Sequence, residues 1–317
     1  MNSLSYLSLI YNPTAGRLRH KPEFVQRAAE WLRPLGEVRL APTTGPETAG
    51  KLAAEAVAGG AKLIVSFGGD GTANEVVNGM VGSGVPLGLL PGGTANVLCV
   101  ELGLGTNPEK AARRLVSESE QVRIAVGKMT RPDGEMRHFL AMAGVGLDAI
   151  VVEDVQPVLK RMAGKIAYWV AGFGMFGRRL PQFHFGMNGG ATQRSYVLAS
   201  RVRNYGGDLE IAKSVSLLEN CFETVAFTGH TSMRYVPYLA GVLAGNAGAM
   251  PGVTVAAATE LRCTPCNGDR VPVQLDGELA GFLPAEFRVV PDALTLLVPR
   301  KYAQRAREQR WITSPIR

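Results

Sequence analysis

Residues 63–72 read LIVSFGGDGT, and this short stretch decides the fold. The largely apolar run 63–67 has no polar alternation, which is typical of a strand that is buried on both faces. It ends in the glycine-rich turn 68–72, and residues 73–81 then follow a helical pattern. Residues 87–96, LGLLPGGTAN, repeat this order and also precede a helical segment. Each stretch therefore predicts a buried strand, a glycine-rich turn and a helix.

The same alternation extends over the first 121 residues. Strands are expected at 7–11, 38–41, 63–67 and 87–90, and helices at 23–32, 46–58 and 73–81. Strands that alternate with helices favour a parallel sheet covered by helices. Residues 1–121 are therefore expected to form an α/β domain with a parallel, Rossmann-like sheet.

The pattern changes after Gln121. Short β-rich runs punctuated by Gly, Pro, Asp and Asn dominate residues 122–298, which favours an antiparallel β-sandwich. Helix-like insertions are expected at 157–176 and 233–244. Residues 299–317 are basic and have a helical pattern, so they form a separate tail in this division of the chain.

The composition excludes several classes of protein. The chain has 317 residues, of which 46% are hydrophobic and 19% charged, as in globular proteins. Four cysteines are too few for a disulfide scaffold. The longest mostly apolar stretch, residues 166–177, is shorter than the roughly 18 residues of a membrane span. The first ten residues lack the basic region of a signal peptide. A soluble, reduced, cytoplasmic protein is expected.

Positive charge gathers in one stretch. The formal net charge is +7, yet residues 155–207 contain no Asp or Glu, eight basic residues and several aromatic ones. Such a stretch fits an anionic membrane surface, a nucleic acid or a plain solvated face. No nucleic-acid-binding module accompanies the charge, so a membrane ranks above nucleic acid, and no nucleic-acid partner is expected.

The two glycine-rich turns suit phosphate binding. Their backbone N–H groups and the following helix N-termini favour anions, and Thr72 and Thr94 add hydroxyl donors. Ligands of open parallel sheets bind at the carboxyl ends of the strands, so both turns are expected to meet over one crevice. Asp70 would repel a bare phosphate, and therefore needs a cation or a fixed hydrogen bond. The alternative is that the glycines serve only the geometry of the turns. The presence of two matched turns favours phosphate binding over this alternative.

Three other motifs are weaker. Residues 45–51 have the spacing of a Walker A loop, but Leu52 replaces the required Ser or Thr, so a turn and helix start is expected. Residues 144–149, GVGLDA, lack the acidic residue of a dinucleotide fingerprint. The lone CxxC at 263–266 has no second pair to complete a zinc site.

Several motifs in order resemble the diacylglycerol kinase catalytic-domain family, which includes bacterial lipid kinases and the sphingosine and ceramide kinases. The resemblance covers about residues 7 to 298, and the GGDGT motif alone is shared with NAD kinases. The matching elements are Asn12-Pro13 with Gly16, Thr43, residues 68–72 with Asn74-Glu75, residues 91–96, residues 144–149, and Asp276-Gly277-Glu278.

The resemblance implies an ATP-dependent kinase that transfers the γ-phosphate to a lipid hydroxyl such as that of diacylglycerol. It implies ATP on the α/β domain, a lipid cleft near the sandwich, and a final segment that returns to the first domain. A peripheral association with the membrane and a homodimer are further expectations. The implied nucleotide-binding residues are Asn12, Thr43, Gly68, Gly69, Asp70, Gly71, Thr72, Glu75, Gly93, Thr94 and Asn96.

The same resemblance assigns the chemistry. Glu278 is the implied proton acceptor for the lipid hydroxyl, with Asp276 orienting it or sharing a metal–water network, and Mg²⁺ near Asp70. From the residues alone, Asp276-Gly277 favours a type I′ hairpin turn without a catalytic role, and only the resemblance favours catalysis. An NAD kinase-like enzyme and a catalytically silent nucleotide- or lipid-binding regulator are the rival functions.

Relatives that resemble this chain carry a further Mg²⁺ site in the second domain, where an Asp-Gly step is flanked by carbonyl ligands. Its positions correspond to Leu217, Asn220 and Phe222. Asn220 and Cys221 stand in place of the Asp and the Gly, and a neutral amide is a weaker ligand for a hard cation. The sequence therefore casts doubt on this auxiliary site.

Overall fold

The computed structural model describes residues 6–154, 177, 179–187, 190–206, 209–243, 246–266 and 268–313. The chain divides into two compact units, one made of Met1–Ala125 with Pro291–Arg317 and the other of Val126–Val290. It passes from one unit to the other inside β5 (Ser119–Thr130) and back inside β18 (Ala285–Pro299). Each of these two strands therefore has residues in both units.

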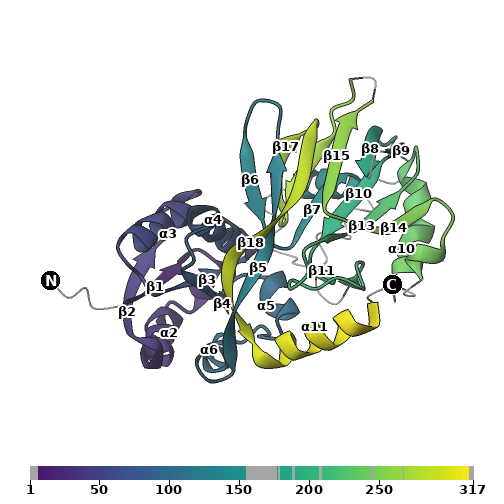
Figure 1. The fold of residues 1–317 in the computed structure, drawn as a ribbon. Helices are drawn as coiled ribbons and strands as arrows, with labels where there is room; N and C mark the ends of the chain where they lie inside the picture. Colours follow the sequence, from purple (N-terminus) through teal and green to yellow (C-terminus); the bar gives the residue numbers. More distant parts are fainter. Residues whose placement is uncertain are drawn as a thin grey trace. The chain divides into compact units, whose positions relative to one another are not determined.

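The first unit contains a parallel sheet (Figure 1). Its strand order is β2-β1-β3-β4-β18, and each of these neighbouring pairs is parallel. All six residues of β3 are buried, as the unbroken apolar run predicts. The expected α/β domain is therefore confirmed. The strands are β1 (Tyr6–Tyr11), β2 (Glu37–Pro42), β3 (Leu63–Gly68), β4 (Pro86–Pro91) and the second half of β18.

Helices cover both faces of this sheet. In Figure 1, α3 and α4 lie on one side and α2 and α6 on the other. The α4 helix begins at Asp70, three residues before the expected start, because extended Gly69 serves as its N-cap. The helices are α1 (Gly16–His20), α2 (Glu23–Leu32), η1 (Arg33–Leu35), α3 (Thr48–Ala58), α4 (Asp70–Met80), α5 (Val97–Glu101), α6 (Pro108–Ser117) and α11 (Arg300–Thr313).

The backbones of α3 and α4 touch. A Cβ atom on Gly79 would lie 2.0 Å from the carbonyl oxygen of Gly50, so neither helix could carry a larger residue there without moving. The Gly45–Lys51 stretch, with its Walker-like spacing, is thus a turn followed by a closely packed helix, as expected. Thr48 closes that turn by donating its hydroxyl to the carbonyl of Gly45 at 2.6 Å.

The second unit is a β-sandwich. One sheet has the antiparallel order β14-β13-β10-β7-β16-β17, and the other brings together β5, β6, β8, β9, β15 and the first half of β18. The new strands are β6 (Met136–Phe139), β7 (Met142–Gly146), β8 (Phe183–Met187), β9 (Gly190–Arg194), β10 (Tyr196–Ser200), β13 (Phe222–Phe227), β14 (Val253–Ala258), β15 (Glu260–Pro265), β16 (Pro272–Leu275) and β17 (Glu278–Phe282).

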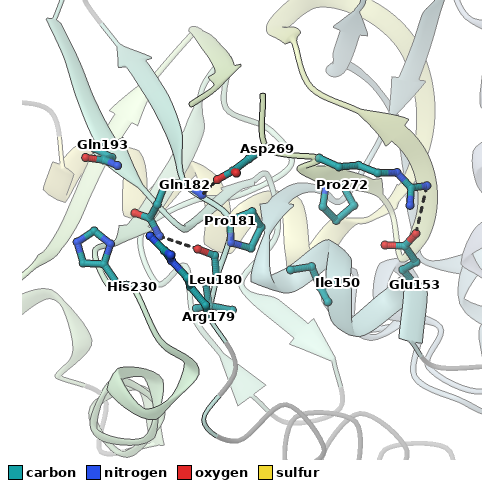
Figure 2. Close-up of a pocket in the computed structure, with 11 residues that line it drawn as sticks. Ile150, Glu153, Arg179, Leu180, Pro181, Gln182, Gln193, His230, Asp269 and Pro272 are labelled. Carbon is teal, nitrogen blue, oxygen red and sulfur yellow. Dashed lines mark hydrogen bonds and ion pairs between the residues drawn. The ribbon is translucent and has the colours of Figure 1, made fainter. Parts of the chain in front are cut away.

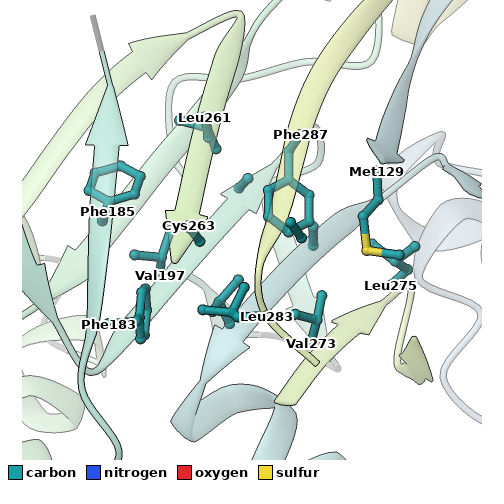
Figure 3. Close-up of a cluster of buried hydrophobic side chains, with 14 of the residues drawn as sticks. Met129, Phe183, Phe185, Val197, Leu261, Cys263, Val273, Leu275, Leu283 and Phe287 are labelled. Atoms are coloured by element: carbon teal, nitrogen blue, oxygen red, sulfur yellow. The ribbon is translucent and has the colours of Figure 1, made fainter. Parts of the chain in front are cut away.

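The core of this unit lies between its two sheets (Figure 3). Alternating residues of β8 enter it, since Phe183 and Phe185 are buried while His184 is exposed. Val273 and Leu275 of the facing sheet complete the layer. The antiparallel sandwich expected from the short β-rich runs is therefore confirmed.

Shorter elements complete the second unit. These are α7 (Leu147–Asp154), β11 (Asn204–Gly206), β12 (Leu209–Glu210), η2 (Ser232–Arg234), α10 (Tyr235–Leu243) and η3 (Ala247–Ala249). The helix expected at 157–176 lies outside the described residues, as does much of the basic stretch 155–207. None of the helices in the described ranges combines the length and the apolar character needed to cross a membrane.

Candidate functional site

The two glycine-rich turns of the first unit are in direct contact. Because β3 and β4 are parallel neighbours, the turns at their carboxyl ends meet, as their positions in the sequence predict. The N–H groups of Gly92 and Gly93 donate to the carbonyl oxygen of Gly68 at 2.8 and 3.0 Å. The small pocket that the two turns line has a volume of about 10 Å³, too little for more than about one water molecule. A ligand larger than a water molecule would therefore lie over the turns and not inside this pocket.

Glycine is required where the turns touch. A Cβ atom on Gly93 would lie 2.5 Å from the Cα atom of Gly69, and one on Gly68 would lie 2.5 Å from Oγ1 of Thr72. Thr72 is accordingly buried, whereas Thr94 is exposed. Of the two threonines, Thr94 is the one placed to offer its hydroxyl to a ligand in solvent.

Asn96 holds the second turn in shape. It adopts the left-handed conformation with φ 49°, which Asn tolerates better than most residues. Its Oδ1 accepts from the Gly93 N–H at 2.8 Å and its Nδ2 donates to the Gly93 carbonyl at 2.9 Å. The predicted ligand-binding residue Asn96 thus fixes the backbone of its own turn.

Asp70 is the first residue of α4. Its Oδ1 accepts from the backbone N–H of Leu98, in the first turn of α5, at 3.3 Å. Of the two roles expected for this carboxylate, the fixed hydrogen bond is therefore present. Burial, followed by the charge of Asp70, raises the pKa of the Cys99 thiol. Within the described ranges, His, Cys, Asp and Glu side chains nowhere form a group of three or more that could hold a metal ion.

The other strands of the sheet bring Asn12 and Thr43 to the same edge. Asn12 follows β1, and its Oδ1 accepts from the backbone N–H and the hydroxyl of Thr14 at 2.9 and 2.8 Å. Thr43 follows β2 and is buried, and its N–H donates to the carbonyl of Tyr11 at 2.9 Å. These residues therefore lie at the carboxyl ends of adjacent parallel strands.

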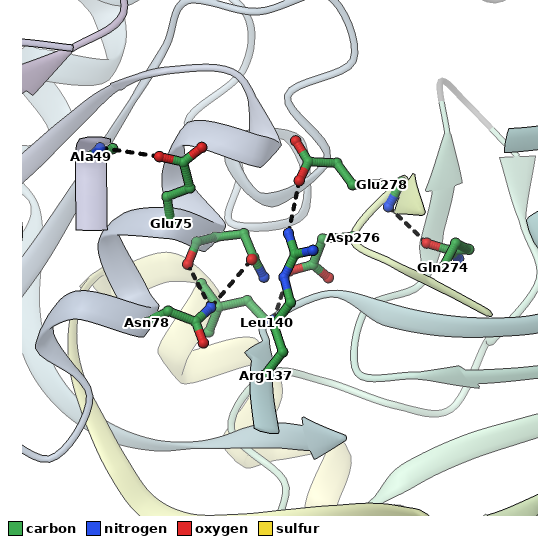
Figure 4. A network of polar contacts seen from close by, with 10 residues as sticks. Ala49, Glu75, Asn78, Arg137, Leu140, Gln274, Asp276 and Glu278 are labelled. Atoms are coloured by element: carbon green, nitrogen blue, oxygen red, sulfur yellow. Dashed lines mark hydrogen bonds and ion pairs between the residues drawn. The ribbon is translucent and has the colours of Figure 1, made fainter. Parts of the chain in front are cut away.

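Glu75 has a structural contact. Its Oε2 accepts from the backbone N–H of Ala49, in the first turn of α3, at 3.0 Å (Figure 4). A carboxylate there complements the positive end of that helix. This contact gives Glu75 a role in joining α3 to α4 that the sequence motif did not indicate.

Sequence reasoning missed Arg17. Its backbone N–H donates to the Gly92 carbonyl at 3.0 Å, which places it beside the second turn. Its Nε is buried and has no hydrogen-bond partner within the described part of the chain. The available signal was the basic run Arg17-Leu18-Arg19-His20, directly after the Asn12 turn.

In the second unit, Asp276 and Gly277 form the hairpin turn between β16 and β17. Both have positive φ, 50° and 84°, and Leu275 pairs with Glu278 across the two-residue turn. The hairpin interpretation of these residues is thus correct for the backbone. The backbone of the turn does not determine what the side chains of Asp276 and Glu278 do.

The Asp276 carboxylate anchors this hairpin. Its oxygens accept from the backbone N–H groups of Leu140, Ala141 and Met142 at 2.9, 2.8 and 2.9 Å. Asp276 is only 8% exposed. Its acceptors are thus engaged with the β6–β7 connection, so the structure ties Asp276 to the position of the turn.

Glu278 is the accessible carboxylate of the hairpin. Its side chain is 43% exposed, and its Oε2 lies 2.8 Å from Nη2 of Arg137 on β6 (Figure 4). The ion pair holds the carboxylate in one orientation. Arg137 was also missed, because nothing in the sequence relates it to a residue 141 positions away.

The GVGLDA segment has a structural explanation. A Cβ atom on Gly144 would lie 1.7 Å from Oδ2 of Asp148, so glycine makes room for a buried carboxylate. Nε2 of Gln274 donates to that oxygen at 2.6 Å, while Oε1 of Gln274 accepts from the Gly277 N–H at 2.7 Å. Burial raises the pKa of Asp148 to about 7, although the Gln274 hydrogen bond opposes this. Gln274 thus links the buried Asp148 carboxyl group to the Asp276–Gly277 turn.

The auxiliary metal positions do not fit a metal ion. The carbonyl of Leu217 accepts from the guanidinium of Arg201 at 3.0 Å, Asn220 is exposed, and Phe222 is buried at the start of β13. A guanidinium cation therefore stands where the resemblance predicts Mg²⁺. The sequence already casts doubt on a site at Leu217, Asn220 and Phe222, and this contact adds a physical reason for that doubt.

A cavity of about 600 Å³ also lies within the second unit (Figure 2). Its lining is mixed, and Arg179, His230 and Asp269 are among the polar residues. Arg270 pairs with Glu153 of α7 at 3.7 Å at one side. Nε2 of Gln182 donates to the Leu180 carbonyl at 3.0 Å. Residues of α7 and β16 line this cavity, and the same two elements carry Asp148 and Gln274.

Comparisons with known proteins agree with these features. Residues 6–129 match the family model of the diacylglycerol kinase catalytic domain, and residues 141–298 match that of the YegS C-terminal NAD kinase beta sandwich-like domain. Diacylglycerol kinase of Bacillus subtilis is 26% identical over 301 residues, covering 93% of this chain and 97% of the relative. That of Mycobacterium tuberculosis is 27% identical over 253 residues, covering 78% and 81%.

A solved structure shares the fold. The crystal structure of a diacylglycerol kinase from Bacillus anthracis superposes with a TM-score of 0.72 at 19% identity, covering 95% of this chain and 99% of that one. The two family models follow one another along the sequence and together account for most of it. The chain belongs to the diacylglycerol kinase catalytic-domain family.

Proposed function

We propose that this protein is an ATP-dependent kinase that transfers the γ-phosphate of ATP to the hydroxyl of a lipid, with diacylglycerol as the first candidate. The observation that carries the proposal is the pair of touching glycine turns at the carboxyl edge of the parallel sheet. Family membership supports the same activity.

The nucleotide phosphates would lie on the N-terminal turn of α4 and on the exposed part of the second turn. The first N–H groups of a helix have no partner inside the helix and favour anions. Thr94 is exposed and Gly71 is half-buried, and Arg17 supplies positive charge beside the second turn. Mg²⁺ would bind together with the triphosphate and neutralise the charge of the phosphates. Most ligands of the ion would be phosphate and water oxygens, and Asp70 is the carboxylate of the turn that could contribute another.

The acceptor hydroxyl needs a base. As its oxygen forms a bond to the γ-phosphorus and the bond to the leaving β-phosphate oxygen breaks, its proton would pass to the carboxylate of Glu278. Arg137 acts as a positioning residue because it fixes the orientation of that carboxylate. Asp276 and Gln274 keep the hairpin in place by their contacts with backbone N–H groups.

The lipid would be reached at a membrane surface by peripheral association. The basic composition of residues 155–207 favours anionic lipids, and the cavity of the second unit offers polar groups that a lipid head group could contact. A cytoplasmic location and a homodimer belong to the same proposal.

The test supplies labelled ATP and Mg²⁺ in three reactions, one with diacylglycerol in mixed micelles, one with NAD and one without an acceptor. Transfer of the labelled phosphate is measured in each. We expect labelled lipid only in the first reaction. Product only with NAD would replace the proposal with an NAD kinase-like function. Nucleotide or lipid binding without transfer to either acceptor would indicate a silent regulator.

A further inference from the structure

Arg201 has a wholly buried side chain. It directly follows β10 in the second unit and is 0% exposed. Its Nη1 donates to the carbonyl oxygens of Glu219 at 3.1 Å and Cys221 at 3.4 Å, and its Nη2 donates to that of Leu217 at 3.0 Å. Residues 217–221 therefore turn three carbonyl oxygens toward one cation.

Such an arrangement needs a positive group. Carbonyl oxygens that converge without a donor or a cation lose their hydration and repel one another, and a buried charge is tolerated only where it is well hydrogen-bonded. The guanidinium satisfies both requirements because its planar donors reach several acceptors at once. The backbone of Arg201 is fixed too, since its N–H donates to the Ala141 carbonyl at 2.8 Å.

The residues around the cation are poor metal ligands. Asn220 is exposed and neutral. Phe222 is committed to the pairing of β13 with β14, where it lies opposite Ala258. The carboxylate of Glu223 accepts from the backbone N–H groups of Lys213 and Ser214 at 3.2 and 2.7 Å. The three carbonyl oxygens of the loop are therefore already occupied by the guanidinium, and the carboxylate of Glu219 accepts from the thiol of Cys221 at 3.5 Å.

We infer that the Arg201 guanidinium takes the place of a metal ion in the 217–221 loop. This positively charged side chain stabilises the loop, and the second unit binds no divalent ion there. A requirement for Mg²⁺ would then arise at another place than this loop. The inference concerns the folding of the second unit and does not depend on the proposed kinase activity.

Thermal unfolding of the whole chain without nucleotide tests it. The wild type and Asn220→Ala are compared in millimolar MgCl₂ and in EDTA. We expect Asn220→Ala to leave the response of Tm to Mg²⁺ unchanged, whatever ions bind elsewhere. A saturable rise in the Tm of the wild type that disappears in Asn220→Ala would overturn the inference.

Removing the guanidinium gives a second test. Arg201→Ala is expected to lower Tm by about 5–10 °C, because it leaves buried carbonyls without a donor. Methylguanidinium should recover part of this loss in Arg201→Ala and have no such effect on the wild type, whereas equal NaCl should not. Adding Asn220→Asp to Arg201→Ala should create a Tm response to Mg²⁺ that Arg201→Ala lacks.

The outcomes of the second test are equally decisive. Equal Tm values for Arg201→Ala and wild type, or the same response of both double and single variants to Mg²⁺, would contradict the inference. If Arg201→Ala does not fold, the comparison of wild type with Asn220→Ala still decides, because neither protein lacks the guanidinium.

Discussion

The glycine turns of the first unit and the Asp276–Gly277 hairpin of the second differ in the parts played by backbone and side chain. In the turns, the proposed ligand contacts are the first N–H groups of α4 and the Thr94 hydroxyl, and side chains such as Asn96 and Asp70 hold the backbone in place. In the hairpin, the backbone is an ordinary two-residue turn, and the exposed group is the side chain of Glu278. Binding and folding should therefore be inseparable in the turns, whereas activity and folding should be separable in the hairpin.

The largest expected effect lies at Glu278. Glu278→Gln removes the proposed proton acceptor but keeps the size of the side chain, so kcat should fall by about 10²–10⁴-fold with little change in Tm. Glu260→Gln is a matched control, because Glu260 also pairs with an arginine on a strand of this unit and is 54% exposed. Labelled-phosphate transfer and thermal unfolding measure the two effects. Wild-type activity in Glu278→Gln would remove this residue from the mechanism.

Gly93→Ala should damage both binding and folding. The new Cβ atom would lie 2.5 Å from the Cα atom of Gly69, so the turns must separate, at a cost of about 1–3 kcal/mol. We expect weaker binding of an ATP analogue by calorimetry together with a lower Tm. Gly45→Ala serves as the control, since nothing lies within 4 Å of a Cβ atom there. If both variants behave alike, contact between the turns is not what requires glycine.

Asp276→Ala should act mainly on stability. It leaves three backbone N–H groups without their acceptor, which costs about 1–3 kcal/mol or more. Denaturant unfolding should show the loss, with Asp276→Asn intermediate, and kcat per folded molecule should fall far less than in Glu278→Gln. Unchanged stability with abolished transfer would instead place Asp276 in the chemistry.

The smallest effect concerns Asp148, which is linked to the hairpin through Gln274. Its pKa of about 7 in the folded chain exceeds the ordinary value of 3.8, so the folded state retains a proton that the unfolded state releases. This group therefore lowers the free energy of unfolding as pH rises between those values, and the loss persists above pH 7. Asp148→Asn stays neutral, and should be more stable than wild type at pH 8 by at least about 1 kcal/mol, but not at pH 4.

Urea unfolding at both pH values measures the difference. Asp133→Asn is the control, because that carboxylate is 55% exposed and its removal should not produce such a pH dependence. The same pH dependence in wild type and Asp148→Asn would show that Asp148 does not contribute it.

Local patterns predicted much of this molecule. The buried β3 strand and the Asp-Gly hairpin follow from neighbouring residues, the contact between the two turns follows from the alternation of strands and helices, and the structure has each of them. The partners that complete the sites come from distant segments. Leu98 satisfies Asp70, Arg137 meets Glu278, and Arg201 fills the loop at 217–221. Such pairings depend on the three-dimensional path of the chain, which spacing along the sequence does not encode.

The passage of the chain through β18 bears on how the protein is made. Residues 291–299 complete the sheet beside β4, where Thr295 lies opposite Pro86, yet they follow the entire second unit in the sequence. A nascent chain leaving the ribosome can therefore complete the sandwich first, while the edge of β4 stays without its neighbour. The glycine turns are synthesised early, but the sheet that carries them is finished only after the Glu278 hairpin has emerged.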